Sequence, residues 1–115
     1  MDQIGLRFNT NKARMDLLPW DALVAVAEHY TKGAKKYPAR NWENGLKWNE
    51  GCAASLARHL AQWSRGEDYE LENLPSGEMI QVWHDEAMAW NALALIAFRL
   101  RERNELDDRP VVQDV

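Results

Sequence analysis

Hydrophobic and polar positions recur with a helical period along three stretches of this chain. The longest stretch runs from Gly77 to Arg103, contains no proline and ends in a basic turn that suits a helix C-terminus. At about 100° per residue, this helix has one broad apolar arc and a second apolar stripe on its far side. The arc comprises Ile80, Trp83, Ala87, Trp90, Ala94 and Phe98, and the stripe comprises Ala89, Leu93, Ile96 and Leu100. We expect this helix to be central in its subunit, shared with another subunit, or both.

Two polar side chains interrupt the apolar arc of this helix. His84 and Asn91 lie two helical turns apart near its middle, with Met88 and Leu95 beside them. A polar group inside an apolar stripe is costly unless another group satisfies it. Both residues are therefore candidates for a functional site.

Two shorter helices are predicted upstream, from about Pro19 to Lys32 and from about Trp48 to Arg65. The second carries His59 and Ser55 within its apolar side. A single such histidine is more often a satisfied core residue than a ligand, but the same pattern on two helices makes the two interpretations equally good. No stretch alternates convincingly with a period of two residues, so the predicted architecture is all-α, a compact bundle of three to five helices.

The segment GAKKYPARNWENG, residues 33–45, joins the first two helices and is dense in functional residue types. Composition alone is compatible with a solvated basic loop that a tryptophan anchors. The alternative is a phosphate-binding loop with an aromatic ring and an amide nearby to receive a base. The residues in question are Lys35, Lys36, Arg40, Asn41, Trp42 and Glu43.

An acidic cluster follows Gly66 and consists of Glu67, Asp68, Glu70 and Glu72. Such a cluster is commonly a solvated loop, yet carboxylates are also the ligands that Mg²⁺ and Mn²⁺ prefer. The turn LPSG, residues 74–77, is expected to return the long helix antiparallel to the second helix. On that helix Asp85 flanks the His84 side, whereas Glu86 points nearly opposite, so Asp85 is the better ligand candidate.

Composition narrows the classes of protein. The chain has 115 residues and a net charge of −4, which favours one domain over residues 1–115 and disfavours direct binding to nucleic acid or a membrane surface. The lone Cys52 and the lack of an apolar leader or a long apolar run predict a cytoplasmic protein. Residues 1–11 and 104–115 are expected to be flexible or docked on a partner.

Four stretches together resemble a known family: KARMDLLP (12–19), GAKKYPARNWENG (33–45), RHLAQWSRGED (58–68) and HDEAMAWNALAL (84–95). They are similar to the MazZ-like dATP/dGTP diphosphohydrolases of phages and bacteria, within the all-α MazG-like nucleotide pyrophosphohydrolases. The resemblance covers about residues 12–98. It implies a homodimer or homotetramer that hydrolyses a purine deoxynucleoside triphosphate to the monophosphate and pyrophosphate. Related phage enzymes supply deoxyguanylate for genomes that contain 2-aminoadenine.

The site that follows from these residues and this resemblance contains Mg²⁺ or Mn²⁺. Its expected metal ligands are Glu67, Asp68, Glu70, Asp85 and Glu43, and its expected catalytic residues are Glu67, His84, Asp85 and His59. The expected substrate-binding residues are Lys35, Lys36, Arg40, Asn41, Trp42 and Asn91. The sequence departs from the MazG-like pattern, because Glu67 and Glu70 form a Glu-x-x-Glu pair at a helix end and the later Glu-x-x-Asp pair is missing. In relatives a second histidine often stands where this chain has Ala87.

A non-catalytic helical interaction module, or the same chemistry on another nucleotide such as dUTP, remains an alternative.

Overall fold

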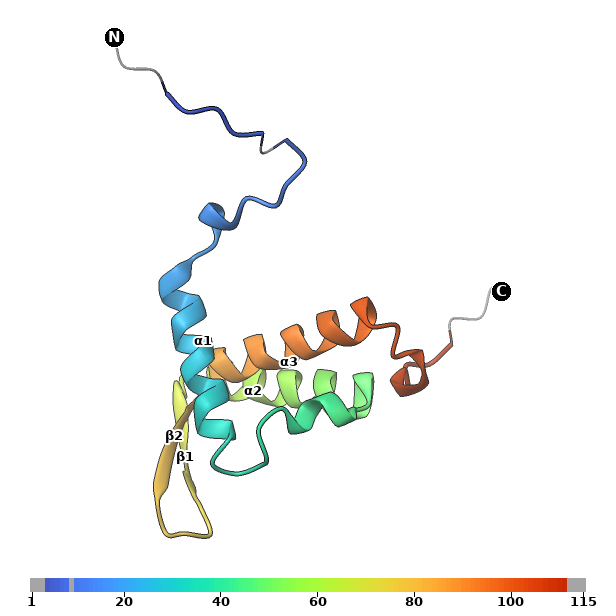
Figure 1. The fold of residues 1–115 in the computed structure, drawn as a ribbon. Coiled ribbons are helices and arrows are strands. Elements are labelled where there is room, and N and C mark those ends of the chain that lie inside the picture. Colours follow the sequence, from blue (N-terminus) through green and yellow to red (C-terminus); the bar gives the residue numbers. More distant parts are fainter. Residues whose placement is uncertain (1–3, 9, 112–115) are drawn as a thin grey trace.

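The computed structural model describes residues 4–8 and 10–111, which form three α-helices, one β-hairpin and several short helical turns (Figure 1). The α-helices are α1 (Trp20–Gly33), α2 (Ala54–Ser64) and α3 (His84–Leu100), and the strands are β1 (Tyr69–Asn73) and β2 (Met79–Trp83). The short elements are three 3₁₀ turns (Met15–Leu17, Asn41–Asn44 and Asn104–Leu106) and a π-helix (Trp48–Ala53). The helices dominate, so the all-α prediction is right in its larger part.

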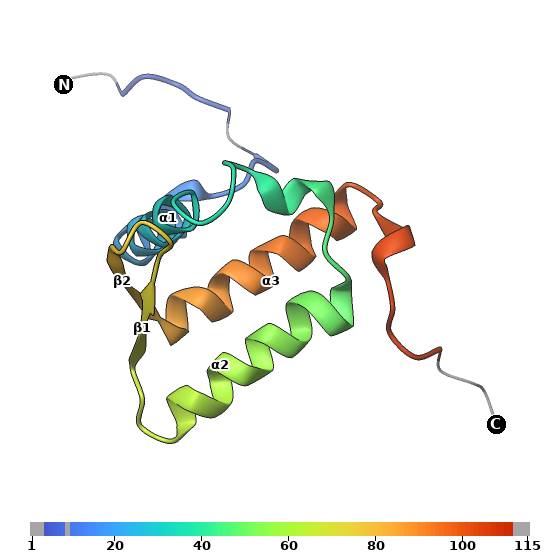
Figure 2. The ribbon, with the colours of Figure 1, turned by 90° about the horizontal axis from the view of Figure 1, so that it is seen from below.

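The antiparallel pair of α2 and α3 forms the body of the molecule (Figure 2). The π-helix runs directly into α2, so the predicted helix from Trp48 to Arg65 exists but begins with wider π turns. Its apolar side meets α3 in a core of Trp48, Cys52, Ala94 and Phe98, in which Phe98 is fully buried. Burial on α3 therefore follows the predicted arc from Ala87 to Phe98.

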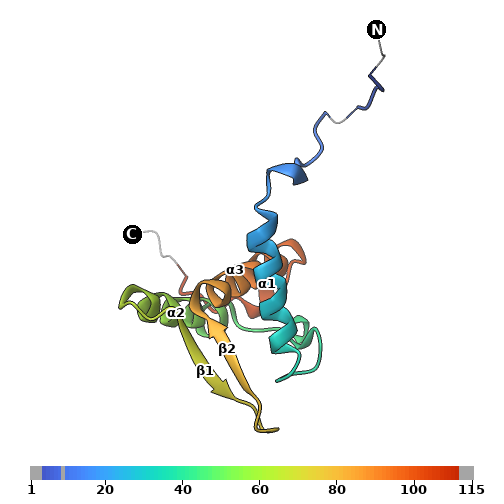
Figure 3. The same ribbon diagram turned by 90° about the vertical axis from the view of Figure 1, so that its left-hand side faces the viewer.

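Helix α1 packs against α3 and against β2, close to its predicted bounds (Figure 3). Tyr30 of α1 meets Trp90 of α3 with ring centroids 6.0 Å apart. Lys32 Nζ donates to the carbonyl oxygen of Gln81 at 2.8 Å, which ties the end of α1 to β2. The C-terminal part of α1 is thereby held over the α2–α3 pair.

The β-hairpin corrects the prediction of an unbroken helix from Gly77 to Arg103. Residues 79–83 are a strand that pairs antiparallel with residues 69–73, and α3 begins only at His84. Ile80 and Val82 are buried on the same face of β2, and β-branched residues favour a strand. The predicted LPSG turn is present, but it joins two strands, with Gly77 at a φ of +88°.

The described part of the C-terminal segment returns to the start of the π-helix. The Asp108 carboxylate accepts hydrogen bonds from the backbone N–H groups of Asn49 and Glu50. Residues 104–111 are therefore tied to the body of the same chain. The flexibility predicted for the two ends also concerns residues 1–3, 9 and 112–115, which lie outside the described residues. Within the described residues, no helix combines the length and the apolar character that a membrane span requires.

Candidate active site

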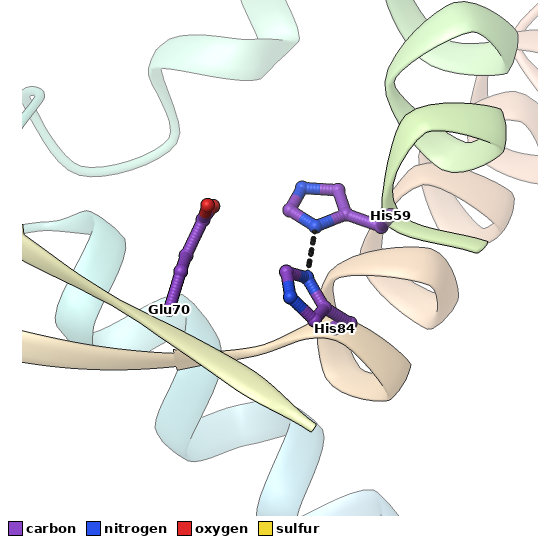
Figure 4. Close-up of side chains that lie close together, drawn as sticks. All are labelled: His59, Glu70 and His84. Carbon is purple, nitrogen blue, oxygen red and sulfur yellow. Dashed lines mark hydrogen bonds between the residues drawn. The ribbon is translucent and has the colours of Figure 1, made fainter. Parts of the chain in front are cut away.

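A pair of histidines joins α2 to the first residue of α3. His59 and His84 face each other with their Nδ1 atoms 2.8 Å apart, and only 5% and 0% of their surfaces are exposed (Figure 4). Each lies within an apolar helix stripe, where its ring would otherwise lack a partner. The contact explains how both polar residues are accommodated in the interior.

Hydrogen bonds on either side of the pair fix the order of its protons. Arg58 Nη2 lies 3.2 Å from His59 Nε2, and a guanidinium can only donate, so this nitrogen accepts. His59 Nδ1–H then donates to His84 Nδ1, and His84 Nε2–H donates to Glu67 Oε1 at 2.7 Å. Each ring therefore carries one N–H, in a hydrogen-bonded chain of side chains that runs from the Arg58 cation to the Glu67 carboxylate. We call this chain the histidine relay.

Glu70 of β1 completes a group of potential metal ligands. One donor atom each from His59, Glu70 and His84 lies within 4.8 Å of the others, as Figure 4 shows for the side chains. Two imidazoles and one carboxylate suit a first-row transition metal better than Mg²⁺, which prefers oxygen ligands alone. The donor set fits a metal ion, and nothing in it identifies which one.

The pleat of β1 turns two glutamates toward the helices. Glu70 and Glu72 are half-buried, whereas Tyr69, Leu71 and Asn73 point outward and are exposed. Glu72 Oε2 accepts a hydrogen bond from Lys36 Nζ at 2.7 Å, and Glu70 Oε1 lies 3.8 Å from Arg58 Nη1. The strand therefore presents carboxylates inward and apolar side chains outward, the reverse of an ordinary amphipathic strand.

A cavity of about 700 Å³ opens beside His59 and is lined by residues of α1, the loop after it, α2, the hairpin and α3. Its charged end is lined by Lys36, Arg58, His59 and Glu72. Its other walls carry aromatic and amide side chains, namely Tyr30, Trp42, Trp90, Asn41 and Asn91. Its volume lies within the range of small-ligand sites, and it combines a charged end with rings on which a base can stack.

The charges around the cavity shift several pKa values. Burial lowers the pKa of His59 below its ordinary value, and the Arg58 charge lowers it further, while Glu70 opposes both. Burial also lowers the pKa of His29, which lines the cavity from α1. The hydrogen bond to Glu72 raises the pKa of Lys36. His59 and His29 therefore favour the neutral form and Lys36 the charged form.

Four of the predicted catalytic and metal-binding residues lie together. The structure joins Glu67, His59 and His84 in the relay and places Glu70 beside them. The Asp85 carboxylate instead turns to the surface and accepts a hydrogen bond from the backbone of Glu86 at 2.7 Å.

Two other predicted metal ligands stand outside this group. Asp68 is exposed and contributes only its backbone carbonyl, which accepts from the His84 N–H. Glu43 forms ion pairs with Arg40 and Arg101 on the loop side of the molecule. Neither carboxylate belongs to the group that surrounds the histidine pair in the described part of the chain.

Five of the six predicted substrate-binding residues line the cavity: Lys36, Arg40, Asn41, Trp42 and Asn91. The sixth, Lys35, forms an exposed ion pair with Glu78, 2.7 Å away. Arg40 is itself 74% exposed at the side chain and pairs with Glu43. The loop therefore turns one of its two neighbouring lysines toward the cavity and the other toward the hairpin turn.

Arg58 and Glu72 are site residues that the sequence reasoning did not select. Arg58 precedes His59 in the RHL motif, and Glu72 follows Glu70 by two residues, a spacing that puts both glutamates on one face of a strand. The two-residue spacing of Glu70 and Glu72 is visible in the sequence, but it is informative only if the segment is a strand. No alternation of apolar residues indicates that strand. Ser55, which was noted in the apolar side of its helix, contacts Asn91 at the cavity wall.

These features define a predominantly helical protein with a possible metal-binding group whose His59 lines a cavity of about 700 Å³. The profile of the family described as dATP/dGTP diphosphohydrolase, N-terminal, matches residues 2–109. The chain therefore belongs to this family, whose name is that of a hydrolase, and the predicted resemblance is confirmed. Comparisons with curated proteins and with solved structures each gave no significant match.

Proposed function

We propose that this protein hydrolyses dGTP, and also dATP, between the α and β phosphates to give the deoxynucleoside monophosphate and pyrophosphate. The observation that carries the proposal is the cavity together with the His59–Glu70–His84 group, of which His59 lines the cavity wall. Membership in a family named for dATP and dGTP supports the choice of substrate. The setting in phage nucleotide metabolism, with a product used for 2-aminoadenine genomes, rests on the resemblance alone.

Three residues would hold the metal ion in this proposal: His59, Glu70 and His84. When bound, a divalent cation neutralises phosphate charge and lowers the pKa of a water molecule. Of the two ions that the resemblance suggests, Mn²⁺ accepts imidazole ligands more readily than Mg²⁺, which prefers oxygen ligands alone. Glu67 holds the His84 ring in place through its Nε2–H, and Arg58 does the same for the His59 ring.

The remaining charged residues bind phosphate and position water. Lys36 and Arg58 both line the cavity and donate to the phosphate oxygens. Both are already paired with glutamates, so the substrate phosphates compete with Glu72 and Glu70 for them. Glu72, released from Lys36 in this way, accepts a proton from the attacking water. Arg40 reaches the outer phosphates from the rim, where its side chain is exposed.

We also propose that the chain acts as a homodimer or homotetramer. The far stripe of α3 leaves Leu93, Ile96 and Leu100 exposed at 39%, 44% and 68%. Trp20 and Val24 of α1 are more than half exposed as well. Apolar surfaces of this kind mark protein contacts, and a second copy of this chain is the partner that the family resemblance implies.

A glutamate exchange tests the catalytic proposal. Glu70→Gln removes the charge of the only carboxylate in the donor group and should lower turnover of dGTP by at least about 100-fold, with loss of Mn²⁺ binding in a calorimetric titration. The matched control Glu78→Gln changes an exposed glutamate on the hairpin turn and should retain turnover. Asp85→Asn should also retain turnover, because the Asp85 carboxylate faces solvent.

The outcomes separate the alternatives. Wild-type turnover by Glu70→Gln would remove the donor group from the mechanism. Loss of turnover in Asp85→Asn with retention in Glu70→Gln would restore the ligand that the sequence favoured. A folded wild-type protein that hydrolyses no nucleotide would instead favour the interaction module.

A further inference from the structure

The amide of Asn91 is buried at the cavity wall with half of its hydrogen-bonding capacity unused. Only 4% of the residue surface is exposed. Its Nδ2 donates to the carbonyl oxygen of Ala87 at 2.9 Å and to Ser55 Oγ at 3.3 Å. A backbone carbonyl can only accept, so the amide nitrogen must face Ala87, and the orientation of the amide is fixed.

The other atom of this amide, Oδ1, accepts no hydrogen bond from the described residues. Oδ1 is nevertheless not sealed from solvent. Among the described residues, the side-chain atoms that are both sealed from solvent and unpaired are Trp48 Nε1 and Glu86 Oε1, and Asn91 Oδ1 is not one of them. Asn91 lines the cavity, which is where Oδ1 remains accessible. A fixed acceptor that faces the cavity and has no protein partner is suited to accept a hydrogen bond from a ligand.

The separation between Asn91 and the histidine pair along α3 matches the separation between the α-phosphate and the base of a nucleotide. Along α3 Asn91 follows His84 by seven residues, a separation of about 10 Å at the helical rise. This is roughly the length of a nucleotide from its α-phosphate to the outer edge of its base. Tyr30, Trp42 and Trp90 line the same region and offer faces on which a purine can stack.

We infer that Asn91 and Ser55 form a base-reading subsite, in which Asn91 Oδ1 accepts an N–H from the Watson–Crick edge of a purine. In guanine the donor is N1–H or the 2-amino group, and in adenine it is the 6-amino group. Ser55 holds the amide and presents its hydroxyl beside it. This inference rests on the proposed function and adds to it the atom that recognises the base.

The test removes the hydrogen bond from each side in turn. Asn91→Leu replaces the amide by an apolar side chain of similar size, and the triphosphate of unsubstituted purine 2′-deoxyriboside keeps the ring but has no N–H on its edge. Met88→Leu, on the same helix, is the matched control. Values of kcat/KM are measured for wild type and both variants with dGTP, dATP and the purine analogue, and each variant is checked by thermal unfolding.

The wild type and Met88→Leu should prefer dGTP over the analogue by about 10- to 100-fold, the range expected when a buried acceptor loses its donor. Asn91→Leu should fold normally and hydrolyse dGTP, dATP and the analogue with the kcat/KM that the wild type shows for the analogue. Removing the acceptor from the protein and removing the donor from the base abolish the same hydrogen bond, so the two losses do not add. Unchanged discrimination by Asn91→Leu, or two additive losses, would overturn the subsite while leaving the proposed function intact. A wild type without turnover would overturn the proposed function itself.

Discussion

The histidine pair predicts a distinct dependence of stability on pH. If both rings were protonated, two N–H groups would meet at the Nδ1 atoms, which lie 2.8 Å apart. Two positive rings with centroids 5.1 Å apart repel by about 3 kcal/mol at an effective dielectric constant of about 20. Protonation of both rings is therefore unfavourable in the folded chain.

The sign follows from the lowered pKa of His59, which burial and Arg58 cause. A histidine whose folded pKa is lowered contributes stability above its unfolded value of 6.5, and this contribution is lost as the pH falls from 6.5 toward the folded pKa. The free energy of unfolding should therefore decrease as the pH falls below 6.5, and the Tm should decrease with it.

Urea unfolding with a chelator present, at several values between about pH 5 and pH 7.5, measures the effect. His59→Gln keeps a polar side chain but cannot titrate, so its free energy of unfolding should fall less steeply than that of the wild type as the pH decreases below 6.5. The pKa of His29 is lowered too, but His29 is present in both proteins and its contribution largely cancels. Equal slopes in the two proteins would refute the account of the pair.

Two further predictions concern assembly and the cavity loop. Ile96→Glu places a charge in the exposed stripe of α3 and should convert the oligomer to a monomer in light scattering, whereas an unchanged mass would exclude this stripe from the interface. Gly45→Ala should lower the free energy of unfolding by about 1–3 kcal/mol, because Gly45 has a φ of +117° and a Cβ there would lie 3.0 Å from a guanidinium nitrogen. Gly66→Ala is the control, because Gly66 has a φ of +93° but no atom within 4 Å of an added Cβ, and it should lower the free energy of unfolding less. Equal losses of stability in the two variants would show that backbone strain alone causes them.

Helical periodicity predicted the three helices and most of the core, but it could not reveal the hairpin. Ile80 and Trp83 fit both the helical arc that continues to Ala87 and a short strand, and periodicity alone does not separate the two over so few residues. The partner strand is concealed because Glu70 and Glu72 face inward. A strand with its polar side toward the interior lacks the apolar alternation by which strands are recognised.

The same feature decided how well the site could be predicted. His59, His84 and Asn91 were identifiable because polar residues inside apolar stripes need partners, and the structure supplies those partners. Asp85 is a predicted ligand because on the helical wheel it flanks His84 whereas Glu86 points nearly opposite. Since α3 starts at His84, Asp85 belongs to an exposed first turn, and the inward carboxylate is Glu70. Convergence of residues from a strand and two helices depends on tertiary packing, which local pattern does not encode.

The most direct measurement is the fate of labelled oxygen during hydrolysis of dGTP in ¹⁸O-enriched water with Mn²⁺. The proposed reaction predicts dGMP and pyrophosphate as the products, with the label in the phosphate of dGMP, because water attacks the α-phosphorus. Label in pyrophosphate would place the attack on the β-phosphorus, and release of inorganic phosphate would indicate stepwise removal of phosphates. Either result, or a folded protein that releases no product, would contradict the account.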